Sequence, residues 1–523
     1  MLFNFSRWLK NIPYKFKLVF GSVYIWGILA HGMALFNKLS FHDDARSLFK
    51  LGSTYPSGRW MLGILSELEK LFYMDGSFSL PLFNGFLSML FIALAACTII
   101  SLLDIKNDFL CCFIGGLMVV FPAVTGYFAY IFCAHVYTLA MFMSVYGVYL
   151  VMRHETPWGF ISGTLLMTLS TGIYQAFIPV YLCLFVLGLL HRFSSVEEVH
   201  SNKVPLLSYI KYCLPSLLRV LSSVILSLVL YFAINKLALQ LSGASLATYK
   251  GLDQMGQASL QEYYSRLHHT ITGYLNPSHW RSSNLYPHST LIIYYICLLG
   301  ILIMGLQMLL RMLRSQPWAA LLCALLLCVF PLCANFSAMM VTVGEVHALM
   351  LYSQLFNFIL FAWLADNVQI NRRTLSKAFT TFVCLLCITL NLMYSRFDNK
   401  CYFKAQLSQQ QAVSFFNVLI SRIQGTEGYS DELPLAIVNE GMLKSDILWN
   451  PEELEDFYLV GYANADYYVN IGSWDYFVRN YCGFQPKLAD ASAFESLPEV
   501  IEMPHYPDAG SVKVINDVVI VKY

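Results

Sequence analysis

Long apolar runs constrain the fold of this chain more than any other feature. A helix that crosses a bilayer needs about 20 mostly apolar residues. About eleven segments satisfy this requirement, and each is predicted to span a membrane: 17–36, 80–103, 109–126, 133–152, 158–174, 176–192, 213–238, 289–310, 317–334, 347–366 and 374–394. Only 12% of the residues are charged, against roughly 25% in soluble domains. The sequence therefore predicts an all-α polytopic membrane protein.

The positions of Lys and Arg predict how the chain is oriented. Short loops on the cytoplasmic side of a membrane are enriched in these residues. The connections near 127–132, 174–176 and 335–344 have none, whereas cations occupy the amino end and the alternate loops: Arg7, Lys10, Lys15, Lys17, Lys106, Arg153, Arg192, Lys203, Lys211, Arg311, Arg314, Arg372, Arg373 and Lys377. We therefore expect a cytoplasmic amino end. The first loop (37–79), the long loop 239–288 and the carboxyl end are then external.

The chain changes character after the transmembrane domain, which is predicted to comprise residues 1–394. Residues 395–523 are polar and mixed, which predicts a small extracytoplasmic α/β domain. Its expected elements are an amphipathic helix near Gln406–Ile423 and strands at Leu435–Val438, Phe457–Val460, Tyr467–Ile471 and Val512–Val521, the last broken by an Asn516-Asp517 turn. Cys401 and Cys482 lie in a compartment where disulfides persist, but the sequence leaves their pairing open.

The first external loop contains the most unusual group of charges. Asp43 and Asp44 follow His42 and would occupy the first turn of a short helix, where negative charge is favourable. A turn at 55–58, with the sequence Tyr-Pro-Ser-Gly, should end this run. An amphipathic helix is expected from Arg59 to Tyr73, lying in the membrane interface. The acids would then lie at the height of the lipid headgroups.

Acids and cations at this height suit transfer of a sugar from a lipid phosphate. Arg59, Arg46 and Lys50 could hold the phosphate, and one carboxylate could act as a general base on the attacking hydroxyl. Phosphate is a good leaving group, so no general acid is required, and the transfer would invert the anomeric carbon. The second carboxylate could orient the acceptor or bind a divalent metal, Mg²⁺ or Mn²⁺, and the need for a metal stays open. The alternative is that Asp43 and Asp44 are a solvated helix cap.

Other polar residues are candidates for substrate binding. Tyr174 and Gln175 fall at an outer helix junction, where they could contact a sugar or simply form part of the interfacial belt. Glu345 and His347 either face a cavity or pair with each other, and Arg266 stands among aromatic residues that suit a sugar-phosphate groove or an interfacial anchor. His135 is expected to be a satisfied histidine of the helix bundle rather than a ligand. The absence of a dinucleotide or Walker motif disfavours a nucleotide-sugar donor, and a net charge of +1 gives no reason to expect a nucleic-acid partner.

Several of these features together resemble a known family. The His-Asp-Asp sequence at 42–44, the Tyr-Pro-Ser-Gly-Arg-Trp turn at 55–60, the many spans and the external carboxyl domain resemble the bacterial serotype-converting glucosyltransferases, with the Tyr174-Gln175 pair as a weaker likeness. That family modifies O-antigen and belongs to the GT-C class of enzymes that use polyprenyl-phosphate sugars. The resemblance implies an undecaprenyl-phosphate-linked hexose donor, with glucose the first choice, and a surface glycan acceptor. It also implies a periplasm-facing active site in the bacterial cytoplasmic membrane, with Asp43 or Asp44 as the base.

Two other functions remain open at this point. A transporter or flippase for a lipid-linked saccharide would carry charges along a path through the midplane, whereas here the charges gather in outer loops. An O-antigen ligase or polymerase would depend on a large later external loop rich in Arg and His, for which 239–288 is a modest candidate. The distribution of charge favours the transferase.

Overall fold

The structure, a computed structural model, describes residues 10–40, 42–51, 54–74, 77–195, 205–248, 251, 259–277, 285–287, 289–341, 346–368, 370, 372–439, 448–455, 457, 459, 464–470 and 474–523. Its residues form two compact units. Unit 1 contains 1–36 and 49–399, and unit 2 contains 37–48 and 400–523. The predicted domain boundary is at 394/395. The first part of the predicted external loop, residues 37–48, belongs to unit 2, and the remainder belongs to unit 1.

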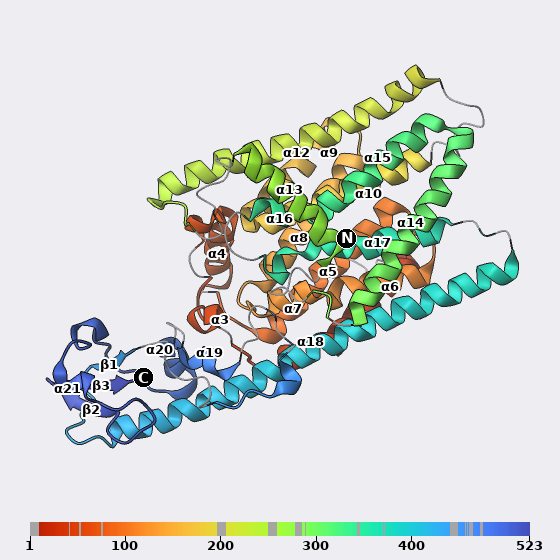
Figure 1. Ribbon diagram of the computed structural model, residues 1–523. Helices are drawn as coiled ribbons and strands as arrows, with labels where there is room; N and C mark the ends of the chain where they lie inside the picture. Colours follow the sequence, from red (N-terminus) through yellow and green to blue (C-terminus); the bar gives the residue numbers. More distant parts are fainter. Residues whose placement is uncertain are drawn as a thin grey trace. The chain divides into compact units, whose positions relative to one another are not determined.

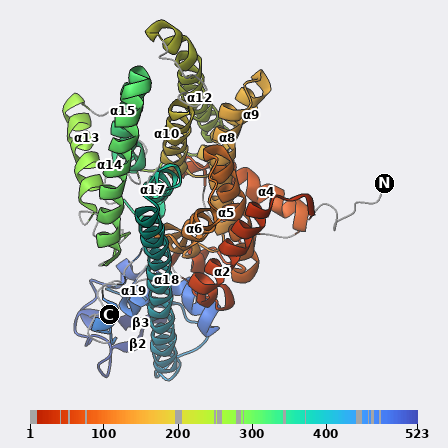
Figure 2. The same ribbon diagram turned by 90° about the vertical axis from the view of Figure 1, so that its right-hand side faces the viewer.

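Unit 1 is a bundle of apolar helices (Figure 1). Its described elements are α2 (Tyr14–Phe36), η1 (Tyr55–Ser57), α4 (Trp60–Tyr73), α5 (Pro81–Leu103), α6 (Asp108–Val120), α7 (Pro122–Phe128), α8 (Ala134–Arg153), α9 (Pro157–Ile173), η2 (Gln175–Phe177), α10 (Ile178–Ser194), α12 (Leu206–Ser242), α13 (Leu260–Leu275), α14 (Ser289–Ser315), α15 (Pro317–Ala334), α16 (Ser337–Met340), η5 (Ala348–Met350), η6 (Tyr352–Leu355), α17 (Phe356–Asn367) and the first part of α18 (Arg373–Gln424). Figure 2 shows α13, α14 and α15 on one side of this unit, α2 and α4 on the other, and α5, α6 and α10 between them.

The helices of unit 1 start and stop where the sequence provides a physical reason. Proline occupies the first turn of α5, α7, α9 and α15, where its missing N–H costs nothing. Pro122 also separates α6 from α7, and the two helices are bent by 42° at that break. The Asn107 and Thr156 side chains accept hydrogen bonds from the backbone N–H groups of Leu110 and Gly159 and so cap α6 and α9.

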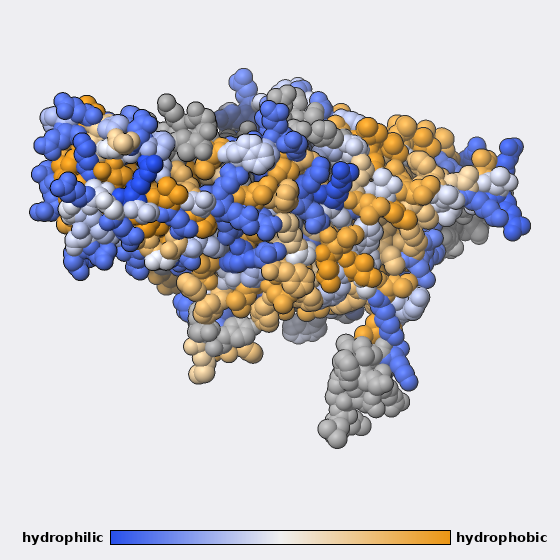
Figure 3. Space-filling model, turned by 90° about the horizontal axis from the view of Figure 1, so that it is seen from below, coloured by the Kyte–Doolittle hydropathy of each residue, from blue (hydrophilic) through white to orange (hydrophobic). Residues whose placement is uncertain are grey.

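Helices form at all eleven predicted segments, but eleven membrane spans are not confirmed. Among the described residues, eight helices are long and apolar enough to span, or nine if the bent pair α6–α7 is one span. Two of the predicted segments form helices that are shorter than 18 residues: α9 has 17 residues and α17 has 12. Apolar side chains are nevertheless exposed over the helical unit, as the orange surface in Figure 3 shows. The protein is therefore membrane-embedded.

The tenth predicted segment, 347–366, is only partly an α-helix. Two 3-10 turns occupy its beginning, and α17 starts at Phe356. Polar side chains here bind the end of α15: Ser353 Oγ donates to the Ala334 carbonyl at 2.8 Å, and Gln354 Nε2 donates to Asn335 Oδ1 at 3.0 Å. These buried bonds satisfy the end of α15 and hold the 347–355 segment in a compact, non-α-helical form.

Unit 2 packs a small sheet between two apolar clusters. Its described elements are α3 (His42–Arg46), the second part of α18, β1 (Leu435–Val438), η8 (Glu452–Leu454), α19 (Ala465–Asn470), α20 (Trp474–Phe477), the π-helical turn η9 (Val478–Cys482), η10 (Ala491–Ala493), α21 (Pro498–Ile501), β2 (Val512–Ile515) and β3 (Val518–Lys522). The strand order is β1-β3-β2, with β1 parallel and β2 antiparallel to β3. Successive strand residues face opposite sides, so Val519 and Val521 contact one cluster, and Ile520 the other.

The predictions for the carboxyl domain are right in part. Strand Leu435–Val438 and the hairpin at 512–521 are confirmed, and Asn516 and Asp517 both have positive φ (52° and 58°), as a two-residue hairpin turn requires. The strand at Tyr467–Ile471 is wrong: its described residues belong to α19, where Ala465, Tyr468 and Val469 are buried at helical spacing. Of the strand predicted at 457–460, the two described residues, Phe457 and Leu459, lie outside any strand. No disulfide joins Cys401 to Cys482.

Candidate active site

The predicted turn at 55–58 forms and sets the position of Arg59. Pro56 lies in the first turn of η1, and Gly58 ends it with a left-handed backbone (φ 68°). A Cβ at Gly58 would lie 2.7 Å from the Tyr231 hydroxyl and 2.8 Å from Gln175 Nε2, so glycine is required here both by the backbone and by its neighbours. Arg59 follows as the N-cap of α4, the expected amphipathic helix.

Side chains from α12 and η2 hold this turn through its backbone. Gln175 Nε2 donates to the Ser57 carbonyl at 2.8 Å and to the Tyr231 hydroxyl at 3.0 Å, and Tyr231 donates to the Gly58 carbonyl at 3.1 Å. Trp60, the first residue of α4, is buried so closely against α9 that a Cβ on Gly172 would lie 2.5 Å from its ring. The turn is therefore fixed on both sides of Arg59.

The Arg59 side chain lies against two buried tyrosines. Its Nη1 donates to the Tyr137 hydroxyl at 3.0 Å, and its guanidinium carbon lies 4.7 Å from the centre of the Tyr174 ring. The two tyrosine rings stack on each other with their centres 4.8 Å apart. A guanidinium in contact with an aromatic face is held in place by cation–π attraction, and arginine is the side chain that can bind an anion in bidentate fashion. Arg59 is half-buried, whereas both tyrosines are 3% exposed.

An open groove of about 470 Å³ runs along the end of α12 beside this turn. Its apolar lining includes Phe232, Leu239 and Leu246, and its polar lining includes Asn235 and Lys236. Asn235 connects the groove to the turn, because its Oδ1 would lie 3.8 Å from a Cβ on Gly58. That oxygen is buried and has no hydrogen-bond partner among the described residues. The groove thus combines a hydrocarbon-compatible wall with a cation, Lys236, and with an acceptor, Asn235 Oδ1, that lies beside Gly58.

The two neighbouring acids, Asp43 and Asp44, differ in their surroundings, and both belong to unit 2. Asp44 is fully buried, and its Oδ2 accepts hydrogen bonds from Lys38 and, at 2.6 Å, from Ser40. Tyr481 in turn donates to Ser40 Oγ, and burial raises the pKa of Tyr481, so it remains a neutral donor. Asp43 is only partly buried. Asp44 is therefore a fixed, charge-balanced group, whereas Asp43 keeps part of its surface exposed.

Asp43 and Asp44 are the two residues that the sequence offered to a divalent metal. Within the described residues, no three His, Cys, Asp or Glu side chains gather in a way that could hold a metal ion. The nearest cation to Asp44 is the Lys38 ammonium, which already balances its charge. A lysine in this place competes with Mg²⁺ or Mn²⁺ for the same oxygen. We assign no step to a metal.

The remaining predicted residues are dispersed. Arg46 is exposed in unit 2, with its guanidinium 5.9 Å from the centre of the Tyr476 ring, and Lys50 is exposed in unit 1. His347 precedes η5, and its carbonyl accepts from the Met350 N–H at 2.8 Å, while Arg266 is half-buried on α13. Glu345 and the side chain of His42 lie outside the described residues. Arg59, Tyr174 and Gln175 are thus the predicted residues that the structure brings together in unit 1.

Sequence reasoning missed Tyr137, Tyr231 and Asn235. Each lies inside a long apolar helix, where an isolated tyrosine or asparagine gives no signal of a binding role. His135 has the hydrogen-bond partner expected of a satisfied bundle histidine, since its Nε2 and Glu69 Oε1 are 2.8 Å apart. Burial alone would raise the pKa of Glu69, but hydrogen bonds from His135 and Ser77 outweigh it and hold that pKa below its usual value. This pair fastens α4 to the start of α8.

The fold and this site define a polytopic membrane protein that presents an arginine, stacked tyrosines and a lipid-compatible groove at one end of its helices. The chain belongs to the GtrII glucosyl transferase family, whose model matches residues 32–358, more than half of its length. It is therefore a membrane-embedded glycosyltransferase that acts on a sugar donor and a glycan acceptor. The matched range contains Asp43, Asp44 and the whole Arg59 site. Comparison with curated proteins and with solved structures gave no match.

Proposed function

We propose that the protein transfers glucose from an undecaprenyl-phosphate-linked donor to a surface glycan such as O-antigen. The reaction takes place at the periplasmic face of the bacterial cytoplasmic membrane and inverts the anomeric carbon. The observation that supports this most strongly is the Arg59 guanidinium, held by Tyr137 and Tyr174, in a turn that an open, apolar-walled groove reaches through Asn235 beside Gly58. A phosphate joined to a long hydrocarbon chain matches both parts of that arrangement.

Arg59 is assigned to the donor phosphate. The phosphate sits at the junction of sugar and lipid, so its negative charge grows when the sugar leaves. A guanidinium that already contacts aromatic faces needs little reorganisation to stabilise this charge. The polyprenyl chain would follow Phe232, Leu239 and Leu246, and Lys236 adds a second positive charge on the groove. Asn235 Oδ1 would accept a hydrogen bond from a sugar hydroxyl, because a hydroxyl can supply the donor that this buried oxygen lacks among the described residues.

Asp43 is assigned as the general base and Asp44 as a residue that positions it. The acceptor hydroxyl gives its proton to the Asp43 carboxylate while its oxygen forms a bond to the anomeric carbon. The bond between that carbon and the phosphate oxygen breaks, and undecaprenyl phosphate departs with the electron pair. Asp44 cannot approach an acceptor in the same way, since it is fully buried and bonded to Lys38 and Ser40. The roles of Asp43 and Arg59 rest on the chemistry of each residue in its own unit.

The proposal is tested by reconstituting the purified protein with undecaprenyl-phosphate glucose and an isolated O-antigen glycan. Wild-type protein should produce a glucosylated glycan and free undecaprenyl phosphate in equal amounts. UDP-glucose supplied alone should give no product. Turnover of the nucleotide sugar in the absence of a lipid-linked donor would contradict the proposed donor.

A further inference from the structure

A second and larger cavity lies at the far end of α10 from Gln175. Its volume is about 800 Å³, and α10, α14 and α17 contribute its lining. The 17 residues of α10 separate it from the Arg59 site by about 26 Å, at 1.5 Å per residue. This distance places the cavity at the other side of the bundle, where the proposed donor does not bind.

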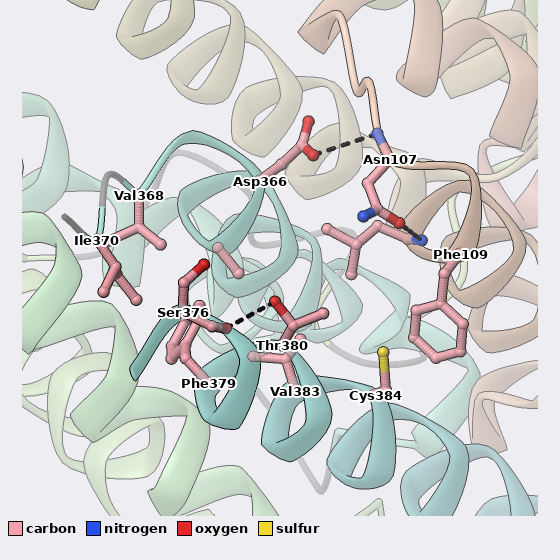
Figure 4. Close-up of a pocket in the computed structure, with 12 residues that line it drawn as sticks. Asn107, Phe109, Asp366, Val368, Ile370, Ser376, Phe379, Thr380, Val383 and Cys384 are labelled. Carbon is pink, nitrogen blue, oxygen red and sulfur yellow. Dashed lines mark hydrogen bonds between the residues drawn. The ribbon is translucent and has the colours of Figure 1, made fainter. Parts of the chain in front are cut away.

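The charged residues that line this cavity are mostly basic. Lys106, Arg311 and Arg314 supply three cations, and the carboxylate among the described lining residues is Asp366. Both carboxylate oxygens of Asp366 already accept hydrogen bonds from the backbone. The donors are the N–H groups of Lys106, at 2.7 Å, and Asn107, at 3.2 Å. Figure 4 shows the bond to Asn107 at a smaller adjoining cavity that Asp366 also lines. Among the lining residues that the structure describes, positive charge is therefore in excess.

The same cavity has an apolar wall that is open to the surroundings of the bundle. Leu306 and Leu310 of α14 line it, yet they are 53% and 51% exposed, so they form both the wall and part of the outer surface of the helix. In a bilayer that surface faces hydrocarbon. Trp363, on the opposite helix α17, is buried against the cavity, and its Nε1 has no hydrogen-bond partner among the described residues. An acceptor oxygen inside the cavity could use that donor.

We propose that this cavity binds the phosphate headgroup of an anionic membrane phospholipid, in the leaflet opposite the Arg59 site. Arg311 and Arg314 pair with the phosphate, the Trp363 N–H binds one of its oxygens, and the acyl chains lie over Leu306 and Leu310. Basic pockets between membrane helices on the cytoplasmic side are suited to such headgroups. Neither the zwitterionic headgroup of phosphatidylcholine nor a free anion matches both the charge and the open apolar wall.

Binding of lipid is measured by native mass spectrometry and by thermal unfolding of the full-length protein in detergent. The added probes are phosphatidylglycerol, phosphatidylcholine and inorganic phosphate. Wild-type protein should retain phosphatidylglycerol and unfold at a higher temperature in its presence. The double variant Arg311→Gln/Arg314→Gln should bind it on the order of tenfold more weakly. Arg372→Gln/Arg373→Gln is the matched control, because it removes two arginines near the same end of α17 that do not line the cavity, and it should bind normally.

Two further comparisons keep the test decisive. Arg311→Lys/Arg314→Lys retains both charges, so it should still prefer phosphatidylglycerol over phosphatidylcholine even if the Gln variant is poorly folded. Equal binding of phosphatidylglycerol by wild type and a folded Gln variant would overturn the proposal. So would an equal effect of phosphatidylcholine, or full stabilisation by inorganic phosphate alone. These measurements involve no sugar transfer, so their outcome is independent of the proposed reaction.

Discussion

The Arg59 guanidinium carbon lies 4.7 Å from the centre of the Tyr174 ring, although six helices, α4 to α9, separate the two residues in the chain. Tyr174 comes directly before η2, and Gln175, the first residue of η2, binds the backbone of the turn that carries Arg59. The first external loop and the α9–α10 junction are thus joined at one point. Arg59 stacks on Tyr174, and the Gln175 side-chain amide donates a hydrogen bond to the Ser57 carbonyl.

Replacing Arg59 should weaken binding of the donor rather than the acceptor. A hydrogen bond to a charged group contributes about 1.5–3 kcal/mol, so Arg59→Ala should raise the donor KM roughly tenfold to a hundredfold. Arg59→Lys should recover part of this, because it keeps the charge but loses the planar contact with Tyr174. Lys70→Ala is the control, since Lys70 lies exposed on the same helix and pairs with Glu67. An unchanged donor KM in Arg59→Ala would remove this residue from the phosphate site.

Asp43→Asn and Asp44→Asn should have different effects. If Asp43 is the base, Asp43→Asn should lower kcat by roughly a hundredfold or more with little change in the unfolding temperature. Asp44→Asn removes a buried charge that pairs with Lys38, so it should lower the unfolding temperature. Steady-state kinetics and thermal unfolding of both purified variants distinguish the two roles. Full turnover by Asp43→Asn would show that another group accepts the proton.

Gly58→Ala should disturb the site through collision as well as strain. A left-handed backbone costs an alanine about 1 kcal/mol, and the new methyl group would also press on Tyr231 and Gln175. Gly483→Ala is a matched control, because Gly483 has nearly the same φ (69°) and its Cβ would meet nothing within 4 Å. Both variants should be slightly less stable, but only Gly58→Ala should lose most of its sugar-transfer activity. Equal activities would mean that the turn tolerates displacement.

Asn235→Ala should reduce activity without reducing stability. Since Asn235 Oδ1 forms no hydrogen bond with the described residues, its loss leaves no partner unsatisfied. If it binds a hydroxyl of the donor sugar, donor KM should rise severalfold while the unfolding temperature stays within about a degree or two of wild type. A fall in unfolding temperature with unchanged kinetics would instead assign Asn235 to packing.

The Glu69–His135 pair should make stability depend on pH in a defined direction. The pKa of Glu69 in the folded protein lies below its ordinary value of about 4.5. At pH values above the ordinary carboxyl pKa, a lowered pKa in the folded protein stabilises the fold. This contribution disappears as the pH falls through the pKa of the folded protein. Wild type should therefore be more stable than Glu69→Gln at pH 7, and the difference should shrink below about pH 4.5. A difference that stays constant down to pH 3 would contradict this role for the pair.

Apolar length predicted the helices well, whereas the site depended on contacts that no local pattern contains. The spans, the 55–58 turn, helix α4 and the 512–521 hairpin follow from periodicity, proline and glycine. Tyr137 could not be recognised, because a tyrosine inside an apolar helix looks the same whether it packs or binds. Asp43 and Asp44 are equivalent in sequence, and only the packing of Lys38 and Ser40 around Asp44 separates them. At 467–471, alternating apolar residues suggested a strand, but burial at helical spacing determined the outcome.

The burial of α10 has a consequence for how the enzyme responds to its membrane. Within Gln175–Ser194, 83% of an 18-residue apolar window is enclosed by protein, so surrounding acyl chains touch little of it. A helix in contact with lipid tilts when bilayer thickness changes, but α10 is shielded from that pressure by its neighbours. The distance between the two ends of α10 is consequently set by its protein contacts, and sugar transfer should vary little between vesicles of short and long acyl chains.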